Sequence, residues 1–245
     1  MQDPYQPVVD GFLALRNRTI DEKARAREAH PDWHVNQDPR IGLLAKLEMA
    51  FGTVGLALMH IQTGLRDPAW WATFTSGVPP ARELKWFIYG YDALTKVGFF
   101  ITEFSIIEST CRVLLRALDP SPCDGARGGF KCVITELLDK RLGFRAEDLA
   151  LLDLMRLLRN TIHNNGVYLE PHRRDQRISY KHRDYGFEDG KPIDFADWET
   201  VLLLSGDALD LSIRLVNHPE IARLPATLTD PFAAQVPRPD PDGPP

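Results

Sequence analysis

The sequence predicts an all-α protein, a helical bundle with one small β-hairpin inserted before the last long helix. Apolar residues recur at helical spacing over most of the chain, and only one short segment alternates in the manner of β-strands. Of the 245 residues, 44% are hydrophobic and 26% are charged, as in globular chains that bury a core. We expect an N-terminal helical extension (1–40), a helical domain (41–223) and a proline-rich disordered tail (224–245).

Helical periodicity predicts six helices, at residues 9–29, 41–65, 81–118, 130–142, 145–165 and 197–217. The helix at 81–118 contains Gly90 and Gly98, so we expect a bend or a break near one of them. Its second half is apolar on almost every side, which predicts a place at the domain centre. Residues 67–80 include a Gly-Val-Pro-Pro break, and we expect a loop with one helical turn there.

Residues 177–195 change from helical to alternating periodicity, which predicts the hairpin. The alternating apolar or aromatic positions are Ile178, Tyr180, His182, Ile193 and Phe195. Residues 188–191 (Glu-Asp-Gly-Lys) lie between the two alternating runs and contain a glycine. We therefore expect the hairpin turn at these four residues.

The cysteines and the apolar segments bear on the compartment. Cys111, Cys123 and Cys132 are odd in number and lack metal-ligand spacing, so we expect free thiols in a reducing compartment, without a disulfide framework. The chain start has no basic segment followed by an apolar run, as a secretory signal would have. Residues 41–61 are interrupted by charged residues and 97–107 are too few to span a bilayer. These patterns favour a cytoplasmic protein that does not enter a membrane.

Four polar side chains share one face of the predicted helix at 145–165. An α-helix turns about 100° per residue, which places Asn160 and His163 within about 40° of Arg156. Arg159 lies about 60° from Arg156, on the side of His163. The opposite face carries an apolar stripe that we expect in the core: Leu151, Leu154, Met155, Leu158 and Ile162.

The polar face continues toward the N-terminus of this helix as Leu149 and Leu152. Leucines that extend a polar face indicate contact with a second helix of the chain or with a second subunit. A symmetric homodimer would bring two Arg/His sets close together.

The chemistry of this face centres on phosphate. A guanidinium binds phosphate through a planar fork of donors, and an imidazole exchanges a proton near neutral pH. Neither a carboxylate pair nor a metal-ligand cluster accompanies them, so we expect no cofactor and no metal. The alternative interpretation is structural, because Arg and His near a helix end are favoured by the helix dipole and His163-Asn164-Asn165-Gly166 is also a helix-stop sequence.

A short basic strip follows the helix. The net charge of −5 excludes a general polyanion binder, yet residues 171–184 hold five Lys or Arg residues. We expect four of them to attract phosphate beside the Arg/His face: Arg173, Arg174, Arg177 and Lys181. A solvated loop remains the alternative interpretation of this strip.

The segment Leu157–Gly166 resembles the signature helix of the HEPN superfamily, in which an Arg, often with a polar follower, precedes a His by a handful of residues. The resemblance extends to the helix with Glu108 and Arg112, and covers roughly residues 41–223. Arg159 has its polar follower but stands only three intervening residues before His163, whereas six separate Arg156 from His163. Either arginine therefore remains the candidate for the motif position.

The resemblance implies a HEPN-type helical bundle, which is usually dimeric. Many members of this superfamily are metal-independent endoribonucleases of phage-defence or toxin–antitoxin systems. His163 would then move a proton, Arg159 or Arg156 would stabilise charge on the phosphate, and Asn160 would orient the site. Glu108 would position an arginine, or else simply pair with Arg112 four residues later. RNA, a nucleotide, an antitoxin or another protein are the expected partners. The alternative function is a non-catalytic HEPN-type module that binds nucleotide, RNA or protein.

Overall fold

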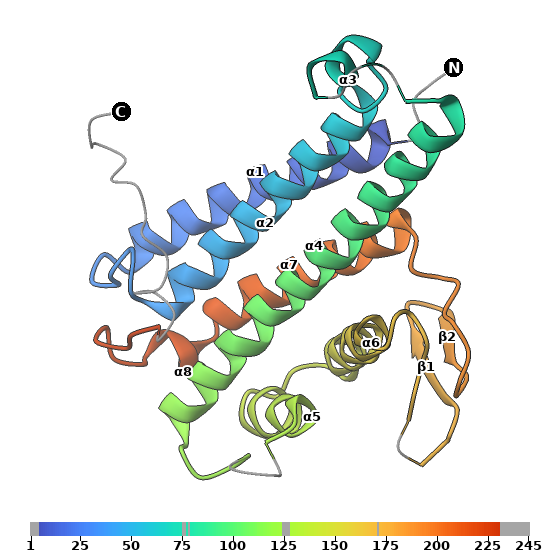
Figure 1. Ribbon diagram of the computed structural model, residues 1–245. Helices are drawn as coiled ribbons and strands as arrows, with labels where there is room; N and C mark the ends of the chain where they lie inside the picture. The colour runs from blue at the N-terminus through green and yellow to red at the C-terminus, as the bar shows by residue number, and fades with distance from the viewer. Residues whose placement is uncertain (1–4, 75–76, 78, 124–127, 171, 231–245) are drawn as a thin grey trace.

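The computed structural model describes residues 5–74, 77, 79–123, 128–170 and 172–230. These residues form a mostly helical structure with one two-stranded antiparallel sheet, as the sequence predicts (Figure 1). Most of the long helices lie roughly along one direction, while the hairpin sits at one side of the bundle (Figure 1).

The first two helices form a pair that packs on the rest of the bundle. α1 (Gln6–Ala29) lies beside α2 (Pro39–Gln62), and both contact the helix near the C-terminus, α7 (Trp198–Val216). Phe12 of α1 is fully buried, with its ring centroid 4.9 Å from that of Phe99. The first helix is thus part of the same hydrophobic core as the later helices.

A buried ion pair begins α2. Asp38 caps the helix by accepting from the backbone N–H of Arg40, and its carboxylate also receives the Arg40 Nε–H at 2.9 Å. The Arg40 guanidinium stacks 3.9 Å from the ring centroid of Trp33 and donates to the carbonyl oxygens of Ile221 and Leu224, each at 3.0 Å. Arg40 therefore joins the start of α2 to the C-terminal part of the chain.

The middle of the chain differs from the prediction in two places. The segment predicted as a loop with one helical turn contains a longer, seven-residue helix, α3 (Pro68–Phe74). α4 (Ala81–Leu118) is a single 38-residue helix that is not divided at Gly90 or Gly98. A Cβ at either glycine would meet nothing within 4 Å, because both lie on the solvent side of the helix.

The buried residues of α4 lie in its second half, from Phe99 to Leu115, but on one side of the helix. Thr102, Ser105 and Arg116 on the opposite side are exposed, so this half does not run through the domain centre as predicted.

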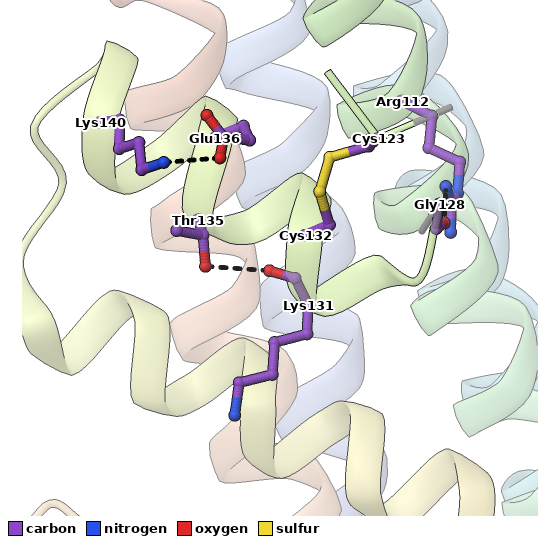
Figure 2. The surroundings of a disulfide bond; sticks show 8 residues. All are labelled: Arg112, Cys123, Gly128, Lys131, Cys132, Thr135, Glu136 and Lys140. Atoms are coloured by element: carbon purple, nitrogen blue, oxygen red, sulfur yellow. Dashed lines mark hydrogen bonds and ion pairs between the residues drawn. A yellow bond between two sulfur atoms is a disulfide. The ribbon is translucent and has the colours of Figure 1, made fainter. Parts of the chain in front are cut away.

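The predicted helix at 130–142 is a short α5 (Phe130–Val133) that continues as a π-helical segment, η2 (Ile134–Arg141). A disulfide joins Cys123 to Cys132 at the start of this region (Figure 2). The expectation of three free thiols is wrong. The backbone at Cys123 adopts a positive φ of 66°, and the two Cα atoms lie 5.8 Å apart. Cys111 is free and buried.

The hairpin is present, but its turn is not at residues 188–191. β1 (Gln176–Tyr180) pairs with β2 (Arg183–Phe187), and the chain reverses at Lys181 and His182. Both turn residues have positive φ values, 45° and 62°, as a two-residue turn of this kind requires. The sequence offers neither Asn nor Gly at these two positions, so turn chemistry could not reveal the reversal.

α7 and a short α8 (Pro219–Ala222) complete the fold. Asp197 caps α7 by accepting from the N–H of Thr200 at 2.7 Å. Residues 224–230 fall in the segment predicted as a disordered tail, and they lie against the start of α2. There, the N–H of Asp230 donates to the carbonyl of Gln37 at 2.7 Å.

α2 is long and apolar enough to cross a membrane by length and composition, although the sequence analysis excluded a span here. It has 24 residues, and the mean hydropathy of its most apolar window is 1.6. In the structure, 56% of that window is buried by other parts of the chain. A helix in the core of a protein needs the same apolar composition.

Candidate functional site

α6 (Ala146–His163) carries the predicted site, and both of its ends are defined by local interactions. At its start, the Asp148 carboxylate accepts from the backbone N–H of Arg145 at 3.2 Å and also pairs with Arg214 of α7. At its end, Asn165 and Gly166 adopt positive φ values of 56° and 82°, which stops the helix. His163 is consequently the last helical residue.

The four predicted polar residues lie on the exposed side of the last three turns of α6. His163 is exposed, whereas Arg156, Arg159 and Asn160 are half-buried. No hydrogen bond joins His163 to Arg156 or Arg159 among the described residues. The exposed imidazole of His163 thus lies at the C-terminal end of α6, and the half-buried guanidinium groups of Arg156 and Arg159 precede it on the same helix.

The two arginines differ in their partners. Arg156 donates from Nε to the carboxylate of Asp153 at 2.7 Å, which neutralises much of its charge. Arg159 donates from one terminal nitrogen to Asn160 Oδ1 at 3.2 Å, and its guanidinium carbon lies 6.0 Å from the ring centroid of Phe104. The Nε of Arg159 is buried and has no hydrogen-bond partner within the described part of the chain. Arg159 therefore has no carboxylate partner among the described residues, whereas Arg156 has one.

The two leucines that extend the polar face are covered by this chain itself. Leu152 is fully buried and Leu149 is half-buried inside this chain. α6 also contacts η2 and β1. Of the six residues named on this face, His163 alone is exposed in the part of the chain that the structure describes.

Glu108 and Arg112 form an ion pair within α4. Arg112 donates from Nε and from one terminal nitrogen to Glu108 Oε1, at 3.0 and 2.6 Å. Its other terminal nitrogen donates to the carbonyl of Gly128 at 2.7 Å, beside the disulfide (Figure 2). Among the described residues, Glu108 makes no hydrogen bond to either arginine of α6. Its observed role is to hold Arg112 against the loop that enters α5.

The basic strip is divided by the hairpin. Arg173, Arg174 and Arg177 lie at the open end of β1, while Lys181 lies at the turn, about 13 Å further along the strand. Lys181 pairs with Asp207 of α7, and Arg177 lies 3.6 Å from Asp184. Arg173 and Arg174 are exposed, and no described residue forms an ion pair with their side chains. Within the described part of the chain, the strip thus has two exposed cations without an ion-pair partner.

Tyr168 lies near the Arg/His face, and the sequence analysis assigned it no role. Its side chain packs on Phe187 with ring centroids 5.4 Å apart, and its hydroxyl is buried with no partner among the described residues. Burial raises the pKa of Tyr168 and the charge of Glu170 adds to this effect, whereas nearby Arg156 opposes it. A tyrosine hydroxyl after a helix-stop sequence has no distinctive spacing, so the sequence could not single it out.

An apolar cleft of about 270 Å³ lies on the other side of α6, between α4, α6 and α7. The lining includes Phe100, Leu158, Ile162, Ile193, Val201 and Leu204. The side chain of Lys96 at this cleft lies 3.7 Å from Asp92. Because the cleft is formed by the apolar stripe of α6, it is separate from the polar face.

No family model, no curated protein and no solved structure matches this chain. The HEPN resemblance of α6 therefore stays a prediction from the sequence. Among the described residues, no group of three or more His, Cys, Asp and Glu side chains is arranged to hold a metal ion. The chemistry of the candidate site must be argued from its guanidinium, imidazole and amide groups.

Proposed function

We propose that this protein is a HEPN-type endoribonuclease that cleaves single-stranded RNA at the C-terminal end of α6. The single observation that carries the proposal is the exposed imidazole of His163 on the same helix face as the half-buried Arg159. Arg159 makes one side-chain hydrogen bond among the described residues, from a terminal nitrogen to Asn160, so its half-buried guanidinium retains terminal donors for an incoming phosphate oxygen.

The reaction that this set supports is an internal transesterification. The ribose 2′-oxygen attacks the adjacent phosphorus, the P–O5′ bond breaks, and the products are a 2′,3′-cyclic phosphate and a 5′-hydroxyl end. His163 carries one of the two proton transfers, either from the 2′-hydroxyl or to the departing O5′. Arg159 stabilises the charge that accumulates on the non-bridging phosphate oxygens, and water or a second imidazole carries the other proton.

One feature of the segment that follows α6 favours an anionic ligand. Arg173 and Arg174 are exposed, and no described residue forms an ion pair with either side chain. Phosphates on either side of the scissile bond would contact these arginines, so binding should weaken as salt rises.

The test is cleavage of a labelled single-stranded RNA in the presence of EDTA. We expect the wild type to yield products with 2′,3′-cyclic phosphate ends, and His163→Ala to yield none. His34→Ala is the matched control, because His34 is also exposed but lies in the loop before α2. Intact RNA at high protein concentration, or equal cleavage by His163→Ala, would exclude the nuclease.

A second candidate function is RNA or nucleotide binding without cleavage. The ion pair of Arg156 with Asp153 favours it, because that pair leaves only one arginine free to act with His163. In this case the labelled RNA is bound but stays intact. Arg173→Ala and Arg174→Ala then reduce the affinity and its salt dependence, while His163→Ala changes neither.

A further inference from the structure

The apolar cleft between α4, α6 and α7 has a buried floor and an open mouth. Its floor consists of side chains that are at most 3% exposed: Phe100, Leu158, Val201 and Leu204. Val97 and Asn165 at its mouth are exposed. A ligand that enters this cleft would therefore bury an apolar part at the floor and keep a polar part near the mouth.

The volume of the cleft limits the size of such a ligand. The cleft measures about 270 Å³, near the lower end of the range for small-molecule sites. A water molecule takes up about 30 Å³ in the liquid, so the cleft has room for about nine groups of that size. A chain of about ten non-hydrogen atoms fits this volume.

Lys96 brings an ammonium group with unused donors to the cleft. Its Nζ lies 3.7 Å from Asp92 Oδ2, beyond hydrogen-bond distance, and it makes no hydrogen bond with any residue that the structure describes. The Asp92 carboxylate instead accepts from the indole N–H of Trp198 at 2.7 Å. The Lys96 side chain is only 25% exposed, so water has limited access to these donors.

Thr200 brings a second unused donor to the cleft. The residue is 4% exposed, and its backbone N–H donates to Asp197, but its hydroxyl makes no hydrogen bond within the described part of the chain. Thr200 lies in the first turn of α7 together with Trp198, whose ring centroid is 5.3 Å from Lys96 Nζ. Lys96 and Thr200 therefore lie on the same side of the cleft, where α4 meets α7.

These two donors select the charge of the ligand. Lys96 is the one charged residue among those that line the cleft, so a cationic ligand would meet a like charge. A phosphate group is best matched by the forked donors of arginine, and here it would bring two negative charges beside Asp92. A carboxylate carries a single charge and has two acceptor oxygens, one for the ammonium of Lys96 and one for the hydroxyl of Thr200.

We propose that the cleft binds an aliphatic monocarboxylic acid of medium chain length. Its carboxylate contacts Lys96 and Thr200, and its chain covers the apolar floor between α4, α6 and α7. The inference does not rest on the proposed nuclease activity, because neither His163 nor Arg159 lines the cleft. It assigns a small-molecule site to the apolar side of α6.

Isothermal titration calorimetry of the full chain tests the charge and the length of the ligand. The probes are octanoate, octanol and octyltrimethylammonium, which share an eight-carbon chain and differ in the charge of the head. We expect one octanoate per chain, octanol bound at least about tenfold more weakly, and no binding of the cation. No binding of octanoate, or equal affinity for octanoate and octanol, would overturn the proposal.

The role of Lys96 is tested by removing its charge while retaining an unbranched side chain. Lys96→Met should weaken octanoate by about tenfold to a hundredfold and leave octanol unchanged. Lys23→Met is the matched control, since the Lys23 side chain is also 25% exposed but pairs with Glu48 away from the cleft. This control should bind octanoate as the wild type does. Unchanged octanoate affinity in Lys96→Met would overturn the assignment of the carboxylate to Lys96.

The location is tested by filling the cleft. Ala93 is half-buried and lines it, so Ala93→Phe should abolish the binding of octanoate and of octanol. Ala57→Phe introduces the same side chain at another half-buried alanine, in the hollow between α2 and α4, and should leave both affinities unchanged. Thermal unfolding of each variant shows that it is folded. Octanoate binding that survives in folded Ala93→Phe would place the ligand elsewhere and overturn the proposal.

Discussion

Ser205 of α7 donates a hydrogen bond of 2.8 Å to Oε2 of Glu103 on α4, and both residues are fully buried. The other carboxyl oxygen of Glu103 has no partner among the described residues. An ionised carboxylate with one hydrogen bond in an apolar interior is costly, whereas the protonated form is not. Glu103 therefore joins the two helices as a neutral acid.

The first prediction concerns pH. Burial raises the pKa of Glu103 to about 8, although the hydrogen bond from Ser205 lowers it, and the ordinary value is 4.5. Between these pH values the folded chain keeps a proton that the unfolded chain has released, so the contribution of Glu103 to stability falls as pH rises from about 4.5 to about 8. At about 1.4 kcal/mol per pKa unit, the fall amounts to several kcal/mol.

Urea unfolding of the wild type and of Glu103→Gln across this pH range measures the effect. The free energy of unfolding of the wild type, relative to that of the variant, should decrease with rising pH. Glu136→Gln is the control, since Glu136 is in a surface ion pair with Lys140 and its loss should leave the slope unchanged. Parallel pH profiles for the wild type and Glu103→Gln would show that Glu103 is ionised in the fold.

The second prediction concerns the disulfide between Cys123 and Cys132. The bond closes a loop with a sequence separation of nine residues, so replacing both cysteines by serine should lower the free energy of unfolding by about 2–3 kcal/mol. A reductant should destabilise the wild type by a similar amount and leave the double variant unchanged. Thiol titration of the unfolded chain should find one thiol before reduction and three after it.

Cys111→Ala provides the control for the titration, because this variant should show no thiol until it is reduced. Three thiols in the unreduced wild type would contradict the bond. Equal stability of the wild type and the double serine variant would show that the bond adds nothing to the fold.

The third prediction concerns the buried ion pair between Asp38 and Arg40. Arg40→Met leaves the Asp38 carboxylate buried without its charge partner, and also leaves the carbonyls of Ile221 and Leu224 without a donor. We expect a loss of about 3–5 kcal/mol in the free energy of unfolding.

A surface ion pair is the matched control for Arg40. Arg141→Met breaks the exposed pair between Arg141 and Glu220 and should cost less than about 1 kcal/mol. Chemical denaturation of both variants measures the difference. Similar losses for the two variants would mean that the Arg40 pair contributes no more than a surface pair.

The helices could be predicted from the sequence because each carries its signal within a few turns. The apolar stripe of α6 and the Asp197 cap of α7 are local patterns, and their helices end within two residues of the predicted limits. The undivided α4 could not be predicted, because an isolated glycine on a solvent face costs a helix only about 1 kcal/mol. Long-range packing offsets that cost without leaving a local signal.

The remaining features depend on contacts between distant residues. Arg40 is buried because its partners Ile221 and Leu224 lie more than 180 residues later in the chain. Helical spacing correctly gathered the polar residues of α6 on one side, since that relation is local. The pair of Asp153 with Arg156 is local too, since an i,i+3 pair lies on one helix side, and the spacing could have indicated it. The spacing could not show that Phe104 of α4 would lie beside Arg159.

The fourth prediction separates the two arginines, which the spacing in the sequence leaves equivalent. Arg156 is held by the carboxylate of Asp153, while Arg159 has a buried Nε that no described residue accepts from. If RNA is cleaved, Arg159→Ala should lower the rate by about a hundredfold to a thousandfold, as the loss of one donor to a developing oxyanion does. Arg156→Ala should cause a much smaller loss, because its charge is already neutralised. The measurement is single-turnover cleavage, with the unfolding of each variant followed in parallel because both arginines are half-buried. A greater loss for Arg156→Ala at equal stability would assign the motif position to Arg156.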